Sequence, residues 1–233
     1  MSTAIFEVPG LPLPVRLQRL RAARVMRLRV DHARRLLKLT APARTAPRHA
    51  LRWAEEQRPW VEAQLAKAPD ALPITNGATL PFQGSQLVVT WTGGRRGAAL
   101  DDDRLLVGGP AESIERAVLR WLQEQARREL SAETQRIAGA AGVTVRSVSI
   151  GDPVSRWGSC SATGNIRYSW RLILAPPECL RFVVAHEVAH RLHMDHSPRF
   201  KAAEAELFGG PVAPARLLLR KLSPSLRAVG RRA

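Results

Sequence analysis

The chain has 233 residues, 45% of them hydrophobic, which is enough to bury a core and excludes a disordered or fibrous protein. Its formal net charge is +16, and two cysteines, Cys160 and Cys179, are too few for a disulfide framework. No signal peptide opens the sequence and no stretch is apolar enough to span a bilayer, so we expect a cytoplasmic protein without a membrane partner.

The N-terminal part of the sequence predicts a basic β-hairpin. Basic and apolar residues alternate from Met26 onward, and an apolar run follows at residues 36–40, which is typical of two paired strands. Arg24, Arg27 and Arg29 are expected on one face of this hairpin. Residues 16–60 hold 13 Lys and Arg against 3 Asp and Glu, whereas the chain between residues 61 and 210 is nearly balanced. The hairpin is therefore our candidate surface for nucleic acid.

The rest of the first half continues this β-rich pattern. Apolar residues at helical spacing predict one helix over residues 47–65, and residues 80–91 and 104–107 are typical of strands. We therefore expect residues 1–108 to form an N-terminal, mostly β module with one helix.

The second half alternates helices with short strands. Residues 110–139 show a long helical pattern, residues 143–150, 156–161 and 166–170 are typical of strands, and a further helix is expected from Pro177 through His190. We interpret residues 109–210 as an α+β catalytic domain and residues 211–233 as a basic C-terminal tail. The predicted fold class of the chain is α+β.

A motif in the last predicted helix carries metal-site chemistry. Residues 186–190 read His-Glu-Val-Ala-His, the H-E-x-x-H pattern. On an α-helix its two histidines lie one turn apart, with about 5–6 Å between their Cβ atoms, so both imidazoles reach one ion. Residues 180–185 are apolar apart from Arg181, which predicts a buried and rigid helix. The motif therefore predicts His186 and His190 as metal ligands.

The third ligand has several candidates, because a tetrahedral catalytic zinc takes three protein ligands and leaves one position open. His196 follows His190 by six residues, the spacing of the H-E-x-x-H-x-x-G-x-x-H proteases. His193 stands where those proteases have glycine, and it is a rival ligand because it lies three residues after His190. Glu204 and Glu206 are acidic alternatives. We favour His196.

These residues predict zinc-dependent hydrolysis. Zinc polarises a scissile carbonyl and lowers the pKa of its bound water toward about 7. Glu187 is the expected general base, which accepts that proton and passes it to the leaving group. Arg156, Tyr168 and His193 are the candidate substrate-binding donors beside the metal. We also expect the strand over residues 166–170 to offer a free edge to an extended peptide.

Further motifs surround the histidines, and with them the sequence resembles the YgjP-like metallopeptidase family, which has SprT-like relatives. The motifs are Arg156-Trp157-Gly158-Ser159-Cys160-Ser161, Gly164-Asn165-Ile166, Trp170-Arg171-Leu172, Pro176, and His196-Ser197 with Phe200. Weaker similarity includes the basic hairpin and Trp60. The resemblance implies a zincin-like catalytic domain with zinc ligands at His186, His190 and His196 and a catalytic Glu187. Ser169, Arg191 and Lys201 depart from the residues usual in the family.

The leading hypothesis is thus a zinc metallopeptidase acting on peptide or protein substrates. Two alternatives stay open: a metal-dependent phosphohydrolase of nucleoside triphosphates, and a protease associated with nucleic acid through the basic hairpin. Against the phosphohydrolase, the sequence contains no glycine-rich phosphate loop.

Overall fold

A computed structural model of the chain confirms the α+β class. It describes residues 3–31, 35–66, 71–153 and 155–231. The chain divides into two compact units, Met1–Pro69 and Asp70–Ala233, which we call unit 1 and unit 2 and describe separately. Within the described ranges, no helix is long and apolar enough to cross a membrane.

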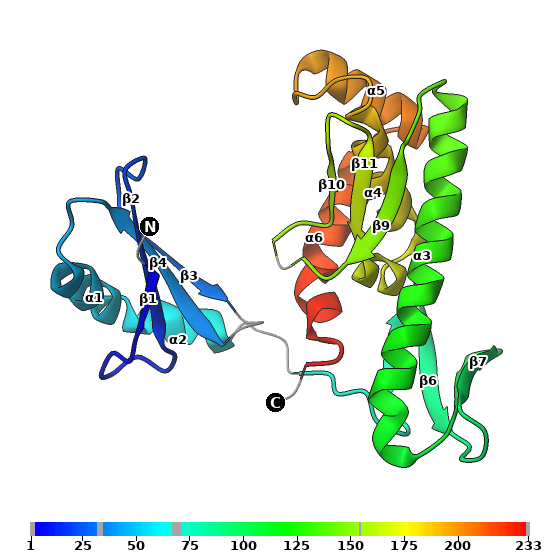
Figure 1. Cartoon of the computed structure of the whole chain (residues 1–233), viewed down its shortest axis with the longest axis horizontal. Helices are drawn as coiled ribbons and strands as arrows, with labels where there is room; N and C mark the ends of the chain where they lie inside the picture. The colour runs from blue at the N-terminus through cyan, green and yellow to red at the C-terminus, as the bar shows by residue number, and fades with distance from the viewer. Residues whose placement is uncertain (1–2, 32–34, 67–70, 154, 232–233) are drawn as a thin grey trace. The chain divides into compact units, whose positions relative to one another are not determined.

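Unit 1 is a four-stranded sheet with two helices packed on one face (Figure 1). The strands stand in the order β1-β2-β4-β3, and only the central β2–β4 pair is parallel. Alternate side chains of the central strands, including Val15, Leu17, Leu37 and Leu39, form the core with small residues of the helices. The elements are β1 (Thr3–Phe6), β2 (Val15–Leu20), β3 (Arg27–Asp31), β4 (Leu36–Pro42), α1 (Pro47–Glu56) and α2 (Arg58–Ala66).

The predicted hairpin is confirmed as the antiparallel pair β3–β4, in which Arg27 lies opposite Thr40. Arg24 precedes β3 and is not part of it. The turn at residues 32–34 falls outside the described residues. A single helix over residues 47–65 is wrong, because α1 ends at Glu56 and α2 begins at Arg58. Pro59 accounts for this break, since it has no N–H to continue the hydrogen bonding of α1.

Unit 2 begins with a second four-stranded sheet, whose order β5-β6-β8-β7 and strand directions repeat those of unit 1. The long helix α3 packs on this sheet, and the strand residues Leu80, Leu87, Leu105 and Val107 belong to the same core as α3. The elements are β5 (Thr79–Phe82), β6 (Ser85–Trp91), β7 (Gly97–Asp101), β8 (Arg104–Gly108), the 3-10 turn η1 (Ala111–Ser113) and α3 (Ile114–Ala140).

This packing places the boundary between units at residues 69 and 70, whereas we expected it at 108 and 109. The physical reason is that the apolar side chains of β5, β6 and β8 have their partners in α3 and in the helices that follow. Residues 71–108 therefore belong to the same folding unit as the H-E-x-x-H motif.

A three-stranded sheet and three helices complete unit 2. The strand order is β10-β11-β9, with β11 antiparallel to β10 and parallel to β9. Figure 1 shows α3 running beside this sheet and α4 lying next to α5 and α6. The elements are β9 (Ser147–Gly151), β10 (Gly158–Cys160), β11 (Asn165–Ser169), the 3-10 helix η2 (Trp170–Leu174), α4 (Pro177–Ala189), α5 (Pro198–Phe208) and α6 (Ala213–Ala228).

Two further expectations are corrected by these elements. The strand over residues 166–170 has no free edge, because β11 is the central strand and is paired on both sides. Residues 211–233 are not a detached tail, since Ala215, Leu219 and Leu226 of α6 are buried in the core of unit 2. The amphipathic spacing of these residues along α6 gives the basic end of the chain an apolar side that packs on α4.

Candidate metal centre

Helix α4 presents His186 and His190 from neighbouring turns at its C-terminal end. The helix is buried on most sides, with Val183, Val184 and Val188 in the core, so its position is set by packing. The centroids of the two imidazole rings lie 5.0 Å apart. The i, i+4 spacing of the sequence therefore becomes a pair of adjacent imidazoles on a rigid support.

His196 joins this pair from the turn between α4 and α5. Its ring centroid lies 5.3 Å from that of His186 and 4.9 Å from that of His190. One ligand atom from each of the three histidines lies within 4.8 Å of the others. His193 is not among the residues with a positive φ, so this turn forms without the left-handed backbone that requires glycine.

Phe200 packs against the imidazole rings of all three histidines. It is 1% exposed, and its ring centroid lies 4.6 to 5.1 Å from those of His186, His190 and His196. Phe200 is placed by the start of α5, where the Ser197 side chain accepts a hydrogen bond from the Phe200 N–H at 3.4 Å. The His-Ser and Phe motif residues of the sequence thus build the turn and the apolar floor of the cluster.

The ring nitrogens that point away from the cluster have partners of their own. His186 Nδ1 donates to Glu204 Oε1 at 2.7 Å, and Glu204 in turn accepts from Arg216 at 2.9 and 3.1 Å. His190 Nδ1 donates to the backbone carbonyl of His193 at 3.2 Å. In a neutral imidazole these bonds leave Nε2 with its lone pair, directed into the cluster.

This arrangement fits a tetrahedral metal ion. His186 Nε2 and His196 Nε2 lie 3.4 Å apart. Two nitrogens bound at about 2.0–2.1 Å to a tetrahedral zinc also lie about 3.4 Å from each other. Burial, and then the neighbouring His186, lower the pKa of His190, which favours the neutral ring that a cation needs. The donor set therefore suits zinc, and three histidines leave one of four positions open.

Glu187 follows His186 on α4, and its side chain packs against Gly158 of the edge strand β10. Its side chain is 4% exposed, and this burial raises the pKa of its carboxyl to about 7, against a smaller opposing effect of the Arg156 charge. Gly158 of β10 allows the close approach, because a Cβ built there would lie 2.5 Å from Glu187 Oε1. The glycine of the Trp-Gly-Ser motif is thus required by the position of the carboxylate.

The comparisons with known proteins agree with this geometry. The family model described as YgjP-like, metallopeptidase domain, matches residues 24–218, most of the chain. The chain belongs to the YgjP-like metallopeptidase family. A search of curated proteins finds no match. Membership in a metallopeptidase family implies a metal-dependent hydrolase at the level of the family.

Three substrate-binding donors are predicted in this YgjP-like chain, and the prediction is wrong for Tyr168. It is 0% exposed, and its hydroxyl is hydrogen-bonded to Thr134 of α3 at 3.0 Å, so it ties β11 to α3 and does not face a substrate. Arg156 is exposed and acts electrostatically on Glu187. The backbone carbonyl of His193 accepts a hydrogen bond from the ring of His190, and the ring of His193 is not part of the three-histidine cluster.

The sequence offers Glu204 only as an alternative third ligand and does not indicate its hydrogen bond to His186. The structure places it behind His186, where its 1% exposed carboxylate orients the ring. The position of Glu204 in the sequence gives a partial signal. Glu204 comes seven residues after Ser197, about two helical turns, so both residues lie on the same side of α5. The pairing with Arg216 of α6 carries no local signal at all.

The other YgjP-like motif residues hold the frame. Arg171 is buried, forms a two-point ion pair with Asp152 at 2.7 and 3.0 Å, and donates to the Leu226 and Val229 carbonyls at the end of α6. Arg191, at the end of α4, donates to the Ala162 carbonyl at 2.9 Å in the turn between β10 and β11. Both arginines thus fix elements that carry or flank the site.

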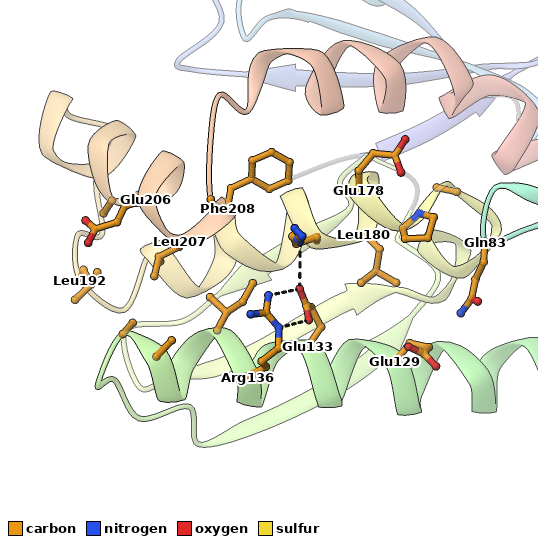
Figure 2. Close-up of a pocket in the computed structure, with 18 residues that line it drawn as sticks. Gln83, Glu129, Glu133, Arg136, Glu178, Leu180, Leu192, Glu206, Leu207 and Phe208 are labelled. Atoms are coloured by element: carbon orange, nitrogen blue, oxygen red, sulfur yellow. Dashed lines mark hydrogen bonds and ion pairs between the residues drawn. The ribbon is translucent and has the colours of Figure 1, made fainter.

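A large cavity of unit 2 is separate from the histidines. It has a volume of about 1070 Å³ and lies between α3, α4 and α5, lined among others by Glu129, Glu133 and Arg181 (Figure 2). Its α4 residues are Pro177, Glu178, Leu180 and Arg181, and a 3.6-residue period places Pro177, Leu180 and Arg181 on the side of α4 away from His186. Figure 2 shows that Glu133 is already ion-paired with Arg136. We assign this cavity no part in the metal chemistry.

Proposed function

We propose that this chain is a zinc-dependent peptidase in which His186, His190 and His196 hold the metal and Glu187 is the general base. The observation that carries the proposal is the convergence of three neutral-capable imidazoles beside a buried carboxylate. When bound, a zinc ion polarises a scissile carbonyl and makes water acidic enough to attack at neutral pH.

Glu187 moves the proton in this scheme. Burial raises the pKa of the Glu187 carboxyl in the metal-free chain to about 7, which makes it a stronger base than an exposed carboxylate. A bound cation would favour its ionised form, which accepts a proton from the attacking water and returns it to the leaving amine. Arg156 lies near enough to influence Glu187 electrostatically and supplies positive charge at the site entrance. Gly158 keeps the carboxylate in place because it leaves room for it.

We propose an extended peptide as the substrate. Strand β10 is an edge strand of its sheet and carries Gly158 next to Glu187. Its unpaired backbone side offers hydrogen bonds to a peptide main chain, a mode of binding that does not need a particular side-chain sequence. We also infer a cytoplasmic location, since Cys160 and Cys179 are unbridged and thiols remain reduced in that compartment.

Metal analysis and one variant test the assignment. The purified chain is expected to hold one zinc per molecule, and Glu187→Gln to keep the zinc while losing hydrolysis of casein and of a peptide library. Unchanged turnover of this variant would show that another residue is the base. Nucleoside triphosphates serve as the second substrate set, and their hydrolysis without peptide cleavage would replace the peptidase assignment with a phosphohydrolase.

The third ligand is tested with two neighbouring histidines. His196→Ala is expected to weaken zinc binding by at least a hundredfold in a chelator competition, because two remaining ligands hold zinc poorly. His193→Ala is the matched control and should leave the zinc affinity within a few fold, since only its backbone contacts His190. The reverse ranking would make His193 the ligand.

A further inference from the structure

The sheet of unit 1 has a second face, turned away from α1 and α2, that is occupied by cations. Strand alternation places Arg16 and Gln18 of β2, Arg27 and Arg29 of β3, and Lys38 and Thr40 of β4 on this side. We call it the basic face. The alternating partners Leu17, Leu28 and Leu39 face the helices instead.

The pairing register brings the cations into rows. Lys38 on the inner strand β4 lies opposite Arg16 on one side and opposite Arg29 on the other. Neighbouring strands are about 4.8 Å apart, so three cations stand within about 10 Å. The next row places Thr40 between Gln18 and Arg27. A hollow of about 420 Å³ lies over both rows, lined by all six of these residues.

Little within the described residues neutralises this charge. Lys38 forms an ion pair with Asp31 at 2.7 Å. Arg16, Arg27 and Arg29 form no ion pair or side-chain hydrogen bond with any residue that the structure describes. Like charges directly opposite one another destabilise a sheet. The basic face is therefore a surface on which a bound polyanion relieves repulsion between neighbouring strands.

The chemistry of the basic face indicates the kind of polyanion. Arginine has a planar fork of donors that matches phosphate oxygens. No aromatic side chain stands among the described residues of this face, so it lacks the stacking platforms with which proteins hold single strands. Four strands span about 14 Å, wider than the major groove of about 12 Å, so the face meets the backbone and not the base edges.

We propose that the basic face of unit 1 binds the phosphate backbone of duplex DNA, without sequence preference. DNA is favoured over an RNA duplex because recognition of RNA relies on hydrogen bonds to 2′-hydroxyls, and among the residues that line the hollow only Gln18 and Thr40 offer uncharged polar side chains. The inference is independent of the proposed hydrolysis, since it concerns residues of unit 1 alone. Its effect is to hold the chain on DNA.

Fluorescence anisotropy of the full chain with a labelled 24-base-pair duplex of mixed sequence tests the proposal. Binding is expected at micromolar protein in 50 mM salt, with log affinity falling steeply against log salt by about 0.9 for each neutralised phosphate. The triple variant Arg16→Gln, Arg27→Gln, Arg29→Gln should bind at least tenfold more weakly, with a slope smaller by about 2–3. The triple exchange of the same arginines to Lys should retain most of the binding.

The matched control removes the same charge elsewhere in unit 1, with Arg44→Gln, Arg48→Gln and Arg52→Gln in and before α1, and should bind almost like the unaltered chain. Circular dichroism checks that every variant is folded. The proposal is overturned by absence of binding at 10 μM protein, or by equal losses in the two Gln variants. It is also overturned if single-stranded DNA, duplex RNA or polyglutamate binds as tightly as duplex DNA.

Discussion

At the scale of single residues, the site depends on one carboxylate that is almost completely buried. Glu187 is buried, and the loss of hydration raises the pKa of its carboxyl to about 7, while Arg156 acts in the opposite direction. Such a group is harder to ionise in the folded chain than in the unfolded chain. The protonation of Glu187 is therefore linked to stability as well as to its proposed role as the base.

This linkage predicts how the metal-free chain responds to pH. The folded-state pKa of Glu187 lies above the usual 4.5, so the folded form binds the proton more tightly than the unfolded form. Its stabilising effect is complete below pH 4.5 and is lost as the pH rises through 7. The corresponding decrease in the free energy of unfolding is about 3 kcal/mol.

Urea denaturation in the presence of a chelator at a series of pH values measures this decrease. Glu187→Gln should lack it, and every other ionisable group is the same in both proteins, so the difference between the two curves isolates Glu187. Parallel curves for the two proteins would mean that Glu187 keeps an ordinary pKa.

A second prediction at this scale concerns Gly158. Replacing it with alanine puts a methyl group 2.5 Å from Glu187 Oε1, so the carboxylate has to move. We expect Gly158→Ala to lower hydrolysis at least tenfold with the zinc content unchanged, since a misplaced base loses its contribution to proton transfer. The measurement is the steady-state rate alongside metal analysis.

Gly139 of α3 provides the control for this exchange. A Cβ at Gly139 meets no atom within 4 Å, and alanine is the better helix former, so Gly139→Ala should leave hydrolysis unchanged and raise stability by about 0.5–1 kcal/mol. Equal rates for the two variants would remove the argument that Gly158 makes room for the base.

At the scale of elements, the metal centre joins three helices. His186 comes from α4, Glu204 from α5 and Arg216 from α6, and a chain of hydrogen bonds and ion pairs of 2.7 to 3.1 Å connects them. The buried carboxylate thus transmits the position of α6 to the ring of a proposed metal ligand. This explains why residues beyond 210 belong to the structure of the site and are not a tail.

Removing the charge at Glu204 tests this connection. Glu204→Gln cannot accept from His186 and Arg216 with the same strength, so the ring of His186 is less firmly oriented. We expect zinc affinity to fall about 10- to 100-fold. The zinc affinity is measured by competition with a chelator whose absorbance changes when it binds the metal.

Glu206→Gln serves as the control. Glu206 is exposed and lies two residues after Glu204, and this exchange removes the same charge. A loss of affinity of similar size in both variants would point to general electrostatics and away from orientation of His186.

At the scale of the whole molecule, the position of the unit boundary decides which pieces fold. Residues 71–108 supply Leu80, Leu87, Val89, Leu105 and Val107 to the core of unit 2. Unit 1 has its own core around the β2–β4 pair. The two units differ in chemistry as well, because the basic face belongs to unit 1 and the histidine cluster to unit 2.

We therefore expect a fragment of residues 70–233 to fold and to bind zinc with the affinity of the full chain. A fragment of residues 109–233 should fail to fold, because it leaves the apolar side of α3 uncovered. Thermal denaturation and zinc titration of both fragments check this. Cooperative folding of the shorter fragment would restore the boundary expected from the sequence.

Short sequence patterns determined much of this protein's structure by themselves. The i, i+4 histidines and the intervening Glu187 follow from helical periodicity, and the alternation after Met26 predicts β3 correctly, because both patterns depend on residues only two to four positions apart. The spacing to His196 also predicts its place beside the other two histidines. The long helix α3 was predictable for the same reason.

Only the tertiary structure decided the features that join distant parts of the chain. It buries Tyr168 against Thr134, brings Gly158 to Glu187, places Arg216 behind Glu204 and assigns residues 71–108 to unit 2. These contacts join residues about 10 to 70 or more positions apart, and a local hydrophobic pattern shows that a face is buried without showing against which partner. The partner is chosen by the packing of whole elements, which exists only once the chain has folded.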